Sequence, residues 1–163
     1  MATSYADGFS YVKGPFETFV SVISSTATFR KGAPLTYSDD RTLIEAGSDT
    51  TALVGIALHD AANSVYAGKA LVQKILPNTI WATKIETDVS ASAISAGQAY
   101  NIEKSGNNLR LDVDSQSTPM VVIVPREDGT TIDSGDSSVW VTFVQNQVGL
   151  YASNASVQIF AQD

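Results

Sequence analysis

The chain has 163 residues, of which 44% are hydrophobic and only 17% are charged, and its formal net charge is −7. This length suits one domain with a core of its own, and the apolar content argues against intrinsic disorder. An acidic surface repels phosphate groups, so nucleic acid and anionic membranes are not expected partners. The sequence has no cysteine, which excludes disulfides and thiolate metal sites. Its start lacks the basic and apolar regions of a signal peptide, and no apolar run reaches the roughly 18–20 residues of a membrane-spanning helix.

Residues 1–27 differ in pattern from the rest of the chain. Aromatic residues recur there without a helical or strand period, and they are Tyr5, Phe9, Tyr11, Phe16 and Phe19. We predict an extended N-terminal arm over residues 1–27, whose rings are anchors on a partner surface, followed by a β-domain over residues 28–163. Burial of the rings on the partner would offset the entropy lost when the arm is ordered. The alternative is a first strand packed on the protein's own core, and residues 16–22 favour a strand in either case.

The rest of the chain predicts about ten short strands and no long helix, which is the pattern of an all-β fold. Turns at residues 30–34 and 38–41 separate the first hairpin strands, and residues 59–63 favour a short helical turn. We therefore predict a compact β-sandwich or barrel, β-tulip-like in outline, that carries the N-terminal arm.

Four segments indicate which strand faces are buried. Residues 109–114 alternate between apolar and polar, so one face is predicted to be buried and the other wet. The segment 79–85 places on one face Thr79, Trp81, Thr83 and Ile85. Residues 120–124 form a continuous apolar run, which predicts a strand buried on both faces. Residues 139–144 are largely apolar on both faces, which predicts a strand that is central or lies at a subunit interface.

Several short motifs follow one another in an order that is typical of one protein family. A turn of basic, glycine, small, proline and apolar residues spans Lys31 to Leu35, an acidic hairpin tip follows, and Val54-Gly55-Ile56-Ala57 comes next. Farther along are the segments Ile75 to Trp81 and Ala96 to Ile102. Over residues 28–145 this order resembles the head decoration (capsid cement) proteins of tailed bacteriophages. The resemblance implies a β-rich virion protein, usually trimeric, that binds the outside of an icosahedral shell.

The sequence contains no motif for catalysis, and we expect neither an enzyme nor a cofactor. His59 is the only histidine, which is too few for a zinc site, and we expect it on a surface turn. No G-x-S-x-G elbow, P-loop or G-x-G-x-x-G run is present. The segment that starts at Asp112 lacks the glycine and glutamate of an EF-hand loop. Turn chemistry explains the acidic loops at Asp128 and at residues 133–136 as well as calcium binding does, so no metal site is predicted.

The leading hypothesis is a phage capsid decoration protein on the outer surface of the virion. Its partners would be the major capsid protein, whose lattice it stabilises against packaged DNA, and further copies of itself in a homotrimer. The capsid-facing candidates are the aromatic residues of the arm, and the trimer-facing candidates are Trp140, Thr142 and Val144. On this hypothesis, deletion of residues 1–20 leaves a folded protein that no longer binds capsids. The alternative is a carbohydrate-binding β-sandwich module of a virion fibre or cell-surface protein, with Trp81 or Trp140 stacked on sugars.

Overall fold

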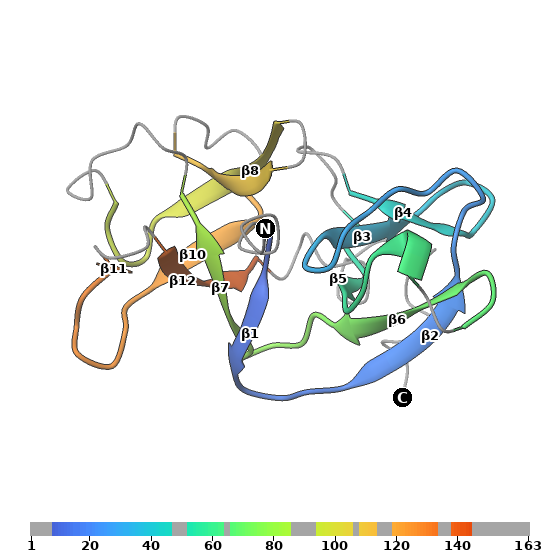
Figure 1. Cartoon of the computed structure of the whole chain (residues 1–163). Helices are drawn as coiled ribbons and strands as arrows, with labels where there is room; N and C mark the ends of the chain where they lie inside the picture. Colours follow the sequence, from blue (N-terminus) through green and yellow to red (C-terminus); the bar gives the residue numbers. More distant parts are fainter. Residues whose placement is uncertain are drawn as a thin grey trace.

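The computed structural model describes residues 8–46, 52–63, 66–85, 94–105, 108–113, 119–133 and 138–144. In this part of the chain two antiparallel β-sheets pack together, and the one helical element is the 3₁₀ turn η2 (Ala61–Asn63) (Figure 1). The compact all-β sandwich that the sequence predicts is therefore confirmed, and so is the short helical turn within residues 59–63.

Seven strands form the first sheet, which lies at the left in Figure 1. In order across the sheet they are β1 (Ser10–Lys13), β7 (Ile80–Lys84), β12 (Ser138–Phe143), β10 (Val121–Val124), β8 (Ala99–Ser105) and β9 (Asn108–Asp112), and β11 (Ile132–Asp133) pairs with β12 off this path. Strand β12 pairs with both β7 and β10. It is therefore a central strand, which is one of the two positions that its apolar faces predict.

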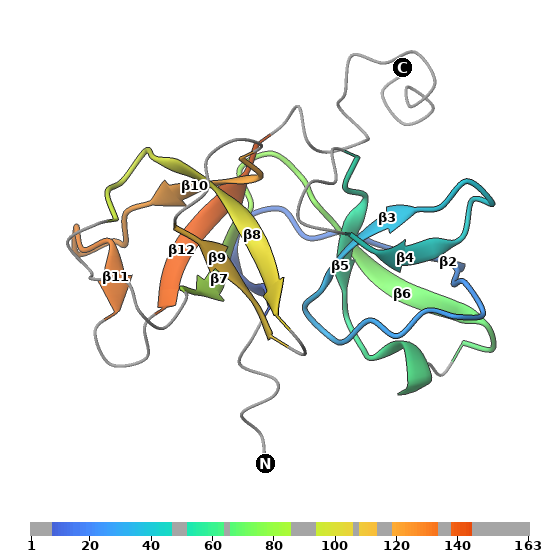
Figure 2. The ribbon, with the colours of Figure 1, turned by 90° about the horizontal axis from the view of Figure 1, so that it is seen from above.

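Five strands form the second sheet, and the view from above in Figure 2 separates it from the first. In order they are β2 (Thr18–Val22), β6 (Lys69–Lys74), β5 (Gly55–Ala57), β3 (Pro34–Tyr37) and β4 (Leu43–Glu45). The consecutive strands β1 and β2 each form an edge of a different sheet. The chain thus passes from the first sheet to the second after β1, and returns between β6 and β7.

Burial alternates along the strands because successive side chains point to opposite faces of a sheet. The grouping of Thr79, Trp81, Thr83 and Ile85 on one face is confirmed, and the structure shows that this is the inner face, since all four side chains are at most 4% exposed. Leu109 and Leu111 of β9 are likewise buried, as the alternation there predicts. The prediction for residues 120–124 is wrong in part. Val121 and Ile123 are buried, whereas Val122 and Val124, which point to the outer face of the first sheet, are only half-buried.

Two hydrophobic clusters hold the sheets. The main core joins the sheets to each other: Trp81, Val141 and Phe143 from the first sheet meet Ile56 and Ile75 from the β5–β6 region. The second core lies on the other face of the second sheet and contains Phe29, Ala33, Leu35, Leu43, Val54, Ala57, Ala70 and Val72. Because β5 sends Ile56 to one core and Ala57 to the other, the second sheet is apolar on both faces.

The two passages of the chain between the sheets, residues 14–17 and 75–79, lie side by side. We call them the crossover pair. The Lys74 N–H donates to the Glu17 carbonyl oxygen at 2.8 Å, and the Thr79 hydroxyl donates to the Pro15 carbonyl oxygen at 3.1 Å. Gly14 has a φ of 113°, and a Cβ at this position would lie 2.8 Å from the Thr79 Cα. Only glycine therefore fits where the two passages touch.

The N-terminal segment belongs to both sheets, so the own-core alternative holds for residues 8–22. Strand β1 pairs with β7 and strand β2 pairs with β6. Phe9, which was expected on a partner surface, is only 3% exposed, and its ring centroid lies 4.9 Å from that of Phe143. Tyr5 lies outside the described residues. Deletion of residues 1–20 would remove β1 and a core side chain, so the truncated chain is not expected to stay folded.

Phe9 is buried and Phe16 is exposed, although both belong to the same aromatic segment, and a matched pair of substitutions tests this difference in burial. Phe9→Ala should lower the free energy of unfolding by about 3–5 kcal/mol because it leaves a cavity in the main core. Phe16→Ala should change it by only about 0.5 kcal/mol, because that ring is 54% exposed. Urea denaturation followed by tryptophan fluorescence measures both values. Equal midpoints for the two variants would contradict the placement of Phe9 in the core.

Candidate functional site

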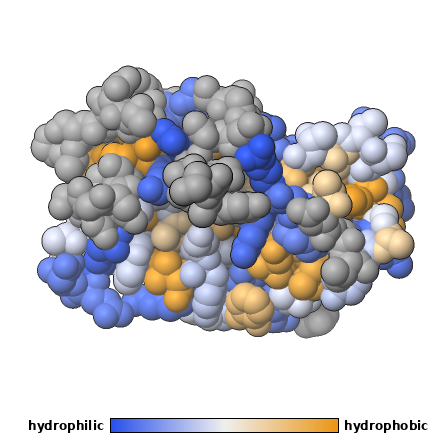
Figure 3. All heavy atoms as spheres, in the orientation of Figure 1, coloured by the Kyte–Doolittle hydropathy of each residue, from blue (hydrophilic) through white to orange (hydrophobic). Residues whose placement is uncertain are grey.

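An exposed apolar surface runs along β1 and β2, and we call it the edge strip. It consists of Tyr11, Phe16, Val20 and Val22, which are 40%, 54%, 43% and 47% exposed. Hydrophobic residues gather over β2 and β6 at the lower right of Figure 3. The strip follows the edge strand of each sheet and the connection between them, so it lies where a further strand or segment can approach.

Local sequence explains how the edge strip forms. The Gly14 turn brings Phe16 back beside Tyr11, whose hydroxyl donates to the Gly14 carbonyl oxygen at 2.6 Å. The two rings meet edge to face, with their centroids 5.3 Å apart. Beyond them, β2 exposes every second residue, including Val20 and Val22. The strand sequence Thr-Phe-Val-Ser-Val contains neither a charge nor a proline, the usual protections of a free sheet edge.

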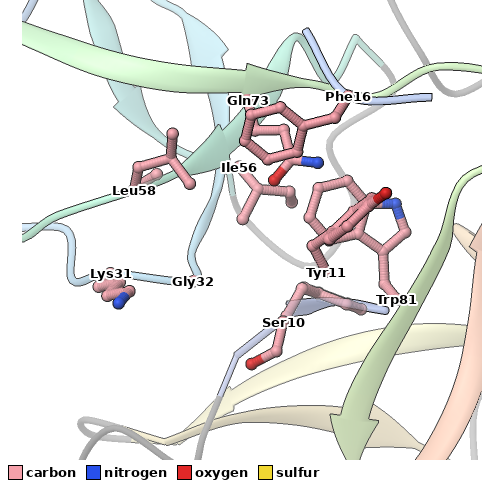
Figure 4. A pocket seen from close by; sticks show the side chains of 11 residues that line it. Ser10, Tyr11, Phe16, Lys31, Gly32, Ile56, Leu58, Gln73 and Trp81 are labelled. Carbon is pink, nitrogen blue, oxygen red and sulfur yellow. The ribbon is translucent and has the colours of Figure 1, made fainter. Parts of the chain in front are cut away.

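A pocket of about 430 Å³ opens beside the edge strip, between the two sheets, and we call it the seam pocket. It is lined by Phe9, Ser10, Tyr11, Phe16, Lys31, Gly32, Ile56, Ala57, Leu58, Gln73 and Trp81. Figure 4 shows the Gln73 amide among the side chains of Phe16, Ile56 and Trp81. Gln73 and Trp81 are each 1% exposed, and neither Gln73 Nε2 nor Trp81 Nε1 has a hydrogen-bond partner.

The outer face of the first sheet is a second apolar surface. Its half-buried apolar members, together with Thr142, are Ile80, Ala82, Val122, Val124, Trp140 and Val144. They are joined at one end by the polar pair Ser138 and Lys84. The three predicted trimer-facing residues therefore share one face, with Trp140 opposite Ala82 and Val124 in the strand register. Two cations lie over the Trp140 ring, with Lys13 Nζ 5.2 Å and Arg126 Cζ 5.3 Å from its centroid. Each such contact contributes about 0.5–1 kcal/mol at an exposed site.

The aromatic residues predicted to face a capsid are only partly brought together. Tyr11 and Phe16 adjoin on the edge strip, whereas Phe9 lies in the main core. Phe19 points to the opposite face of β2 and packs against the second core. Sequence reasoning missed Val20 and Val22, although the alternation of residues 18–22 could have indicated that they share a face.

Neither tryptophan offers an open face for stacking on a sugar. Trp81 is 1% exposed, so its ring lies within the core. Trp140 is half-buried and lies beneath the two cationic side chains described above. The stacking on which the carbohydrate-binding alternative depends therefore has no support in the position of either ring.

His59 has a structural place beside η2. The Leu71 N–H donates to His59 Nε2 at 3.0 Å, which leaves the proton on Nδ1, and Nδ1 lies 2.9 Å from the Asp60 carbonyl oxygen. The ring thereby ties the turn before η2 to strand β6. The residue is half-buried within a bend of the chain, where the sequence predicted a turn.

Among the residues that the structure describes, two side chains have a shifted pKa, and neither lines the seam pocket. Burial raises the pKa of the Tyr100 phenol, whose hydroxyl donates to Gln98 Oε1 at 2.5 Å. The hydroxyl of Thr130 (2.7 Å) and its backbone N–H (2.9 Å) both donate to Asp128 Oδ1 and lower the pKa of that carboxyl group. These bonds close a turn, which is the explanation of Asp128 that the sequence favours over calcium.

A search of the described ranges finds no group of three or more His, Cys, Asp or Glu side chains placed to hold a metal ion. The acidic segments 114–118 and 134–136 lie outside those ranges, so the structure does not describe their loops. Within the same described part of the chain, no helix has the length and apolar character needed to cross a membrane.

The hydrogen bonds of the Asp128 turn lead to a prediction about the pKa of its carboxyl group. Thr130→Val removes the hydroxyl that is the largest cause of the lowered pKa, so the Asp128 pKa should rise towards its ordinary value, whereas Thr130→Ser should keep it low. Because the folded-state pKa lies below that of the unfolded chain, the carboxylate stabilises the fold at neutral pH, and this contribution disappears as the pH falls through the lowered pKa. NMR titration of the carboxyl carbon measures the shift. An unchanged pKa in Thr130→Val would contradict the assignment.

Comparison with known proteins gives no family. No protein-family model matches the chain, and no curated protein matches it in sequence. The resemblance to capsid decoration proteins thus remains a prediction from its short motifs.

Proposed function

We propose that this protein is a phage capsid decoration (cement) protein, which binds the outer surface of the major capsid protein lattice and stabilises the head against the pressure of packaged DNA. The observation that carries the proposal is the edge strip. It presents four large apolar side chains along β1, β2 and their connection. Both strands are edges of the sheets that the described residues form, and main-chain groups at such edges can pair with a partner strand. The short motifs along residues 31–102 support the same role.

The edge strip favours a protein partner over a small solute. Tyr11 and Phe16 supply broad rings, and Val20 and Val22 continue the apolar surface along β2. Each Å² of apolar surface that leaves water contributes about 25 cal/mol, so a partner that covers the strip gains free energy without any charged contact. A cement protein works through such burial, because every contact that spans two capsid subunits adds to the work of separating them.

The outer face of the first sheet supports self-association. Ala82 and Val124 lie opposite Trp140 on the two neighbouring strands, and two cations lie over its ring. Thr142 and Val144 continue the same face without a charge. A homotrimer joined through this face would leave three edge strips for the shell. Three linked attachments bind far more strongly than one, because the second and third become intramolecular.

The net charge of −7 fits a place on the virion surface. A protein with an acidic surface is repelled by the packaged genome and stays soluble at the outside of the shell. In this proposal the protein performs no chemical step, and its effect on the head is mechanical.

Capsid binding tests the edge strip directly. Val20→Lys places an ammonium group in the middle of the apolar surface, and its desolvation on contact should weaken binding by at least about tenfold, equivalent to about 1.4 kcal/mol. Thr28→Lys is the matched control, because it adds the same charge at an exposed position in the segment that covers the second core. Co-sedimentation with expanded capsids of the cognate phage measures both. Equal binding by the two variants would remove the edge strip from the interface.

Sedimentation velocity tests the outer face. The native chain should sediment with the mass of a trimer, and Thr142→Lys should shift it to the mass of a monomer, since a charge then lies in the contact. Thr28→Lys again serves as the control and should remain a trimer. A native chain that sediments as a monomer at micromolar concentration would refute the homotrimer, and a trimeric Thr142→Lys variant would move the interface elsewhere.

A further inference from the structure

We propose that the seam pocket binds an extended apolar peptide segment of the partner protein, and that the Gln73 side-chain amide pairs with one peptide unit of that segment. This inference rests on the proposed function, because a decoration protein has a protein partner that can supply the segment. It adds a specific recognition site to the broad apolar contact of the edge strip.

Two buried donors without partners point to a ligand in this pocket. An unsatisfied buried donor costs about 1–3 kcal/mol, and native proteins contain few of them. In the described residues four buried side-chain polar atoms lack a partner, and two of these, Gln73 Nε2 and Trp81 Nε1, belong to side chains that line the seam pocket. A ligand that carries an oxygen acceptor in the pocket would satisfy Gln73 Nε2, whereas Figure 4 shows Trp81 Nε1 on the side of the indole away from the Gln73 amide.

The backbone holds Gln73 in place for such a contact. In the strand register Gln73 lies opposite Thr18 of β2 on one side and Ile56 of β5 on the other, so its strand is fixed between two neighbours. Its side chain points to the same face as Ile56, towards the first sheet. A primary amide presents a donor and an acceptor in one plane, and a peptide unit presents the complementary pair.

The walls of the pocket suit an apolar side chain beside that peptide unit. Tyr11 and Phe16 stand at the mouth with much of their rings exposed, and Ile56 and Leu58 line the wall. Figure 4 shows the Phe16 ring beside the Gln73 amide. Because Gln73 Nε2 is buried, the peptide reaches it only when the Phe16 ring swings aside, and this ring lies in the connection between β1 and β2, not within a strand.

The lining favours a peptide over other ligands. Sugar hydroxyls are donors as well as acceptors, and none of the described residues that line the pocket carries a carboxylate to accept from them. The Trp81 ring is also buried. A phosphate would need more than the single cation, Lys31, that the lining supplies. A neutral peptide unit with an aliphatic neighbour fits both the Gln73 donor and the apolar walls.

NMR spectroscopy of the full ¹⁵N-labelled chain tests the inference. The probes are N-acetyl-leucine-N′-methylamide for a peptide and methyl β-glucoside for a sugar. The blocked leucine should shift the Trp81 indole N–H and the Gln73 amide signals in a saturable manner, with little shift of the indole N–H of Trp140, the other tryptophan of the chain. The glucoside should leave all three unmoved. Gln73→Met, which keeps the side-chain length and removes the amide, should weaken the apparent affinity at least about fivefold.

Several outcomes overturn the inference. One is the absence of any shift of the Trp81 and Gln73 signals when the blocked leucine is added. That result would mean that neighbouring aromatic rings alone satisfy the donors. Such a contact exists for Trp81, whose ring meets that of Tyr11 edge to face with the centroids 6.3 Å apart. A response to the glucoside alone, or full affinity in Gln73→Met, also counts against it. Co-sedimentation of the native chain with capsids distinguishes the two proposals. If the chain binds capsids but not the peptide, the decoration function is supported and peptide binding in the seam pocket is refuted. Peptide binding without capsid binding gives the reverse result.

Discussion

The crossover pair is the constraint on which the rest of the structure depends. Residues 14–17 and 75–79 carry the chain from one sheet to the other and back. The Thr79 hydroxyl donates to the Pro15 carbonyl oxygen between them, and Lys74, at the end of β6, donates its N–H to the Glu17 carbonyl oxygen. Their contact leaves no room for a side chain at Gly14. With the two passages held together, the inner faces of both sheets close on a shared core that contains Trp81, Phe143 and Ile56.

The same constraint produces the two candidate binding features. Because the first passage leaves β1 at one sheet edge and enters β2 at the other, the rings of Tyr11 and Phe16 are placed at the junction and cannot enter the core. The space beneath them, between the sheets, is the seam pocket. The edge strip and the pocket are thus parts of one surface; in the proposed binding mode, apolar area would supply affinity and the Gln73 amide would supply orientation.

The two faces of the first sheet differ in burial. Its inner face, with Val139, Val141 and Phe143, holds the fold together. Its outer face, which includes Trp140 and Thr142, is apolar but only half-buried. A central strand that is apolar on both sides gives more apolar surface than one core can cover, and the proposed trimer would bury the remainder.

The sequence by itself determined the fold class and most strand faces, because period-two alternation and turn residues are local signals that act within a few residues. The alternation at 109–114 is an example, whereas for residues 79–85 the period gave the two faces and the structure decided which one is buried. It did not determine that Phe9 is core while Phe16 is exposed, since both are phenylalanines in the same aromatic segment. Their difference depends on Phe143 and on the crossover pair, which are distant in sequence. No local pattern in the sequence singled out Gln73 either. Its amide becomes a candidate binding group only because the two sheets pack around it and leave its Nε2 donor buried without a partner.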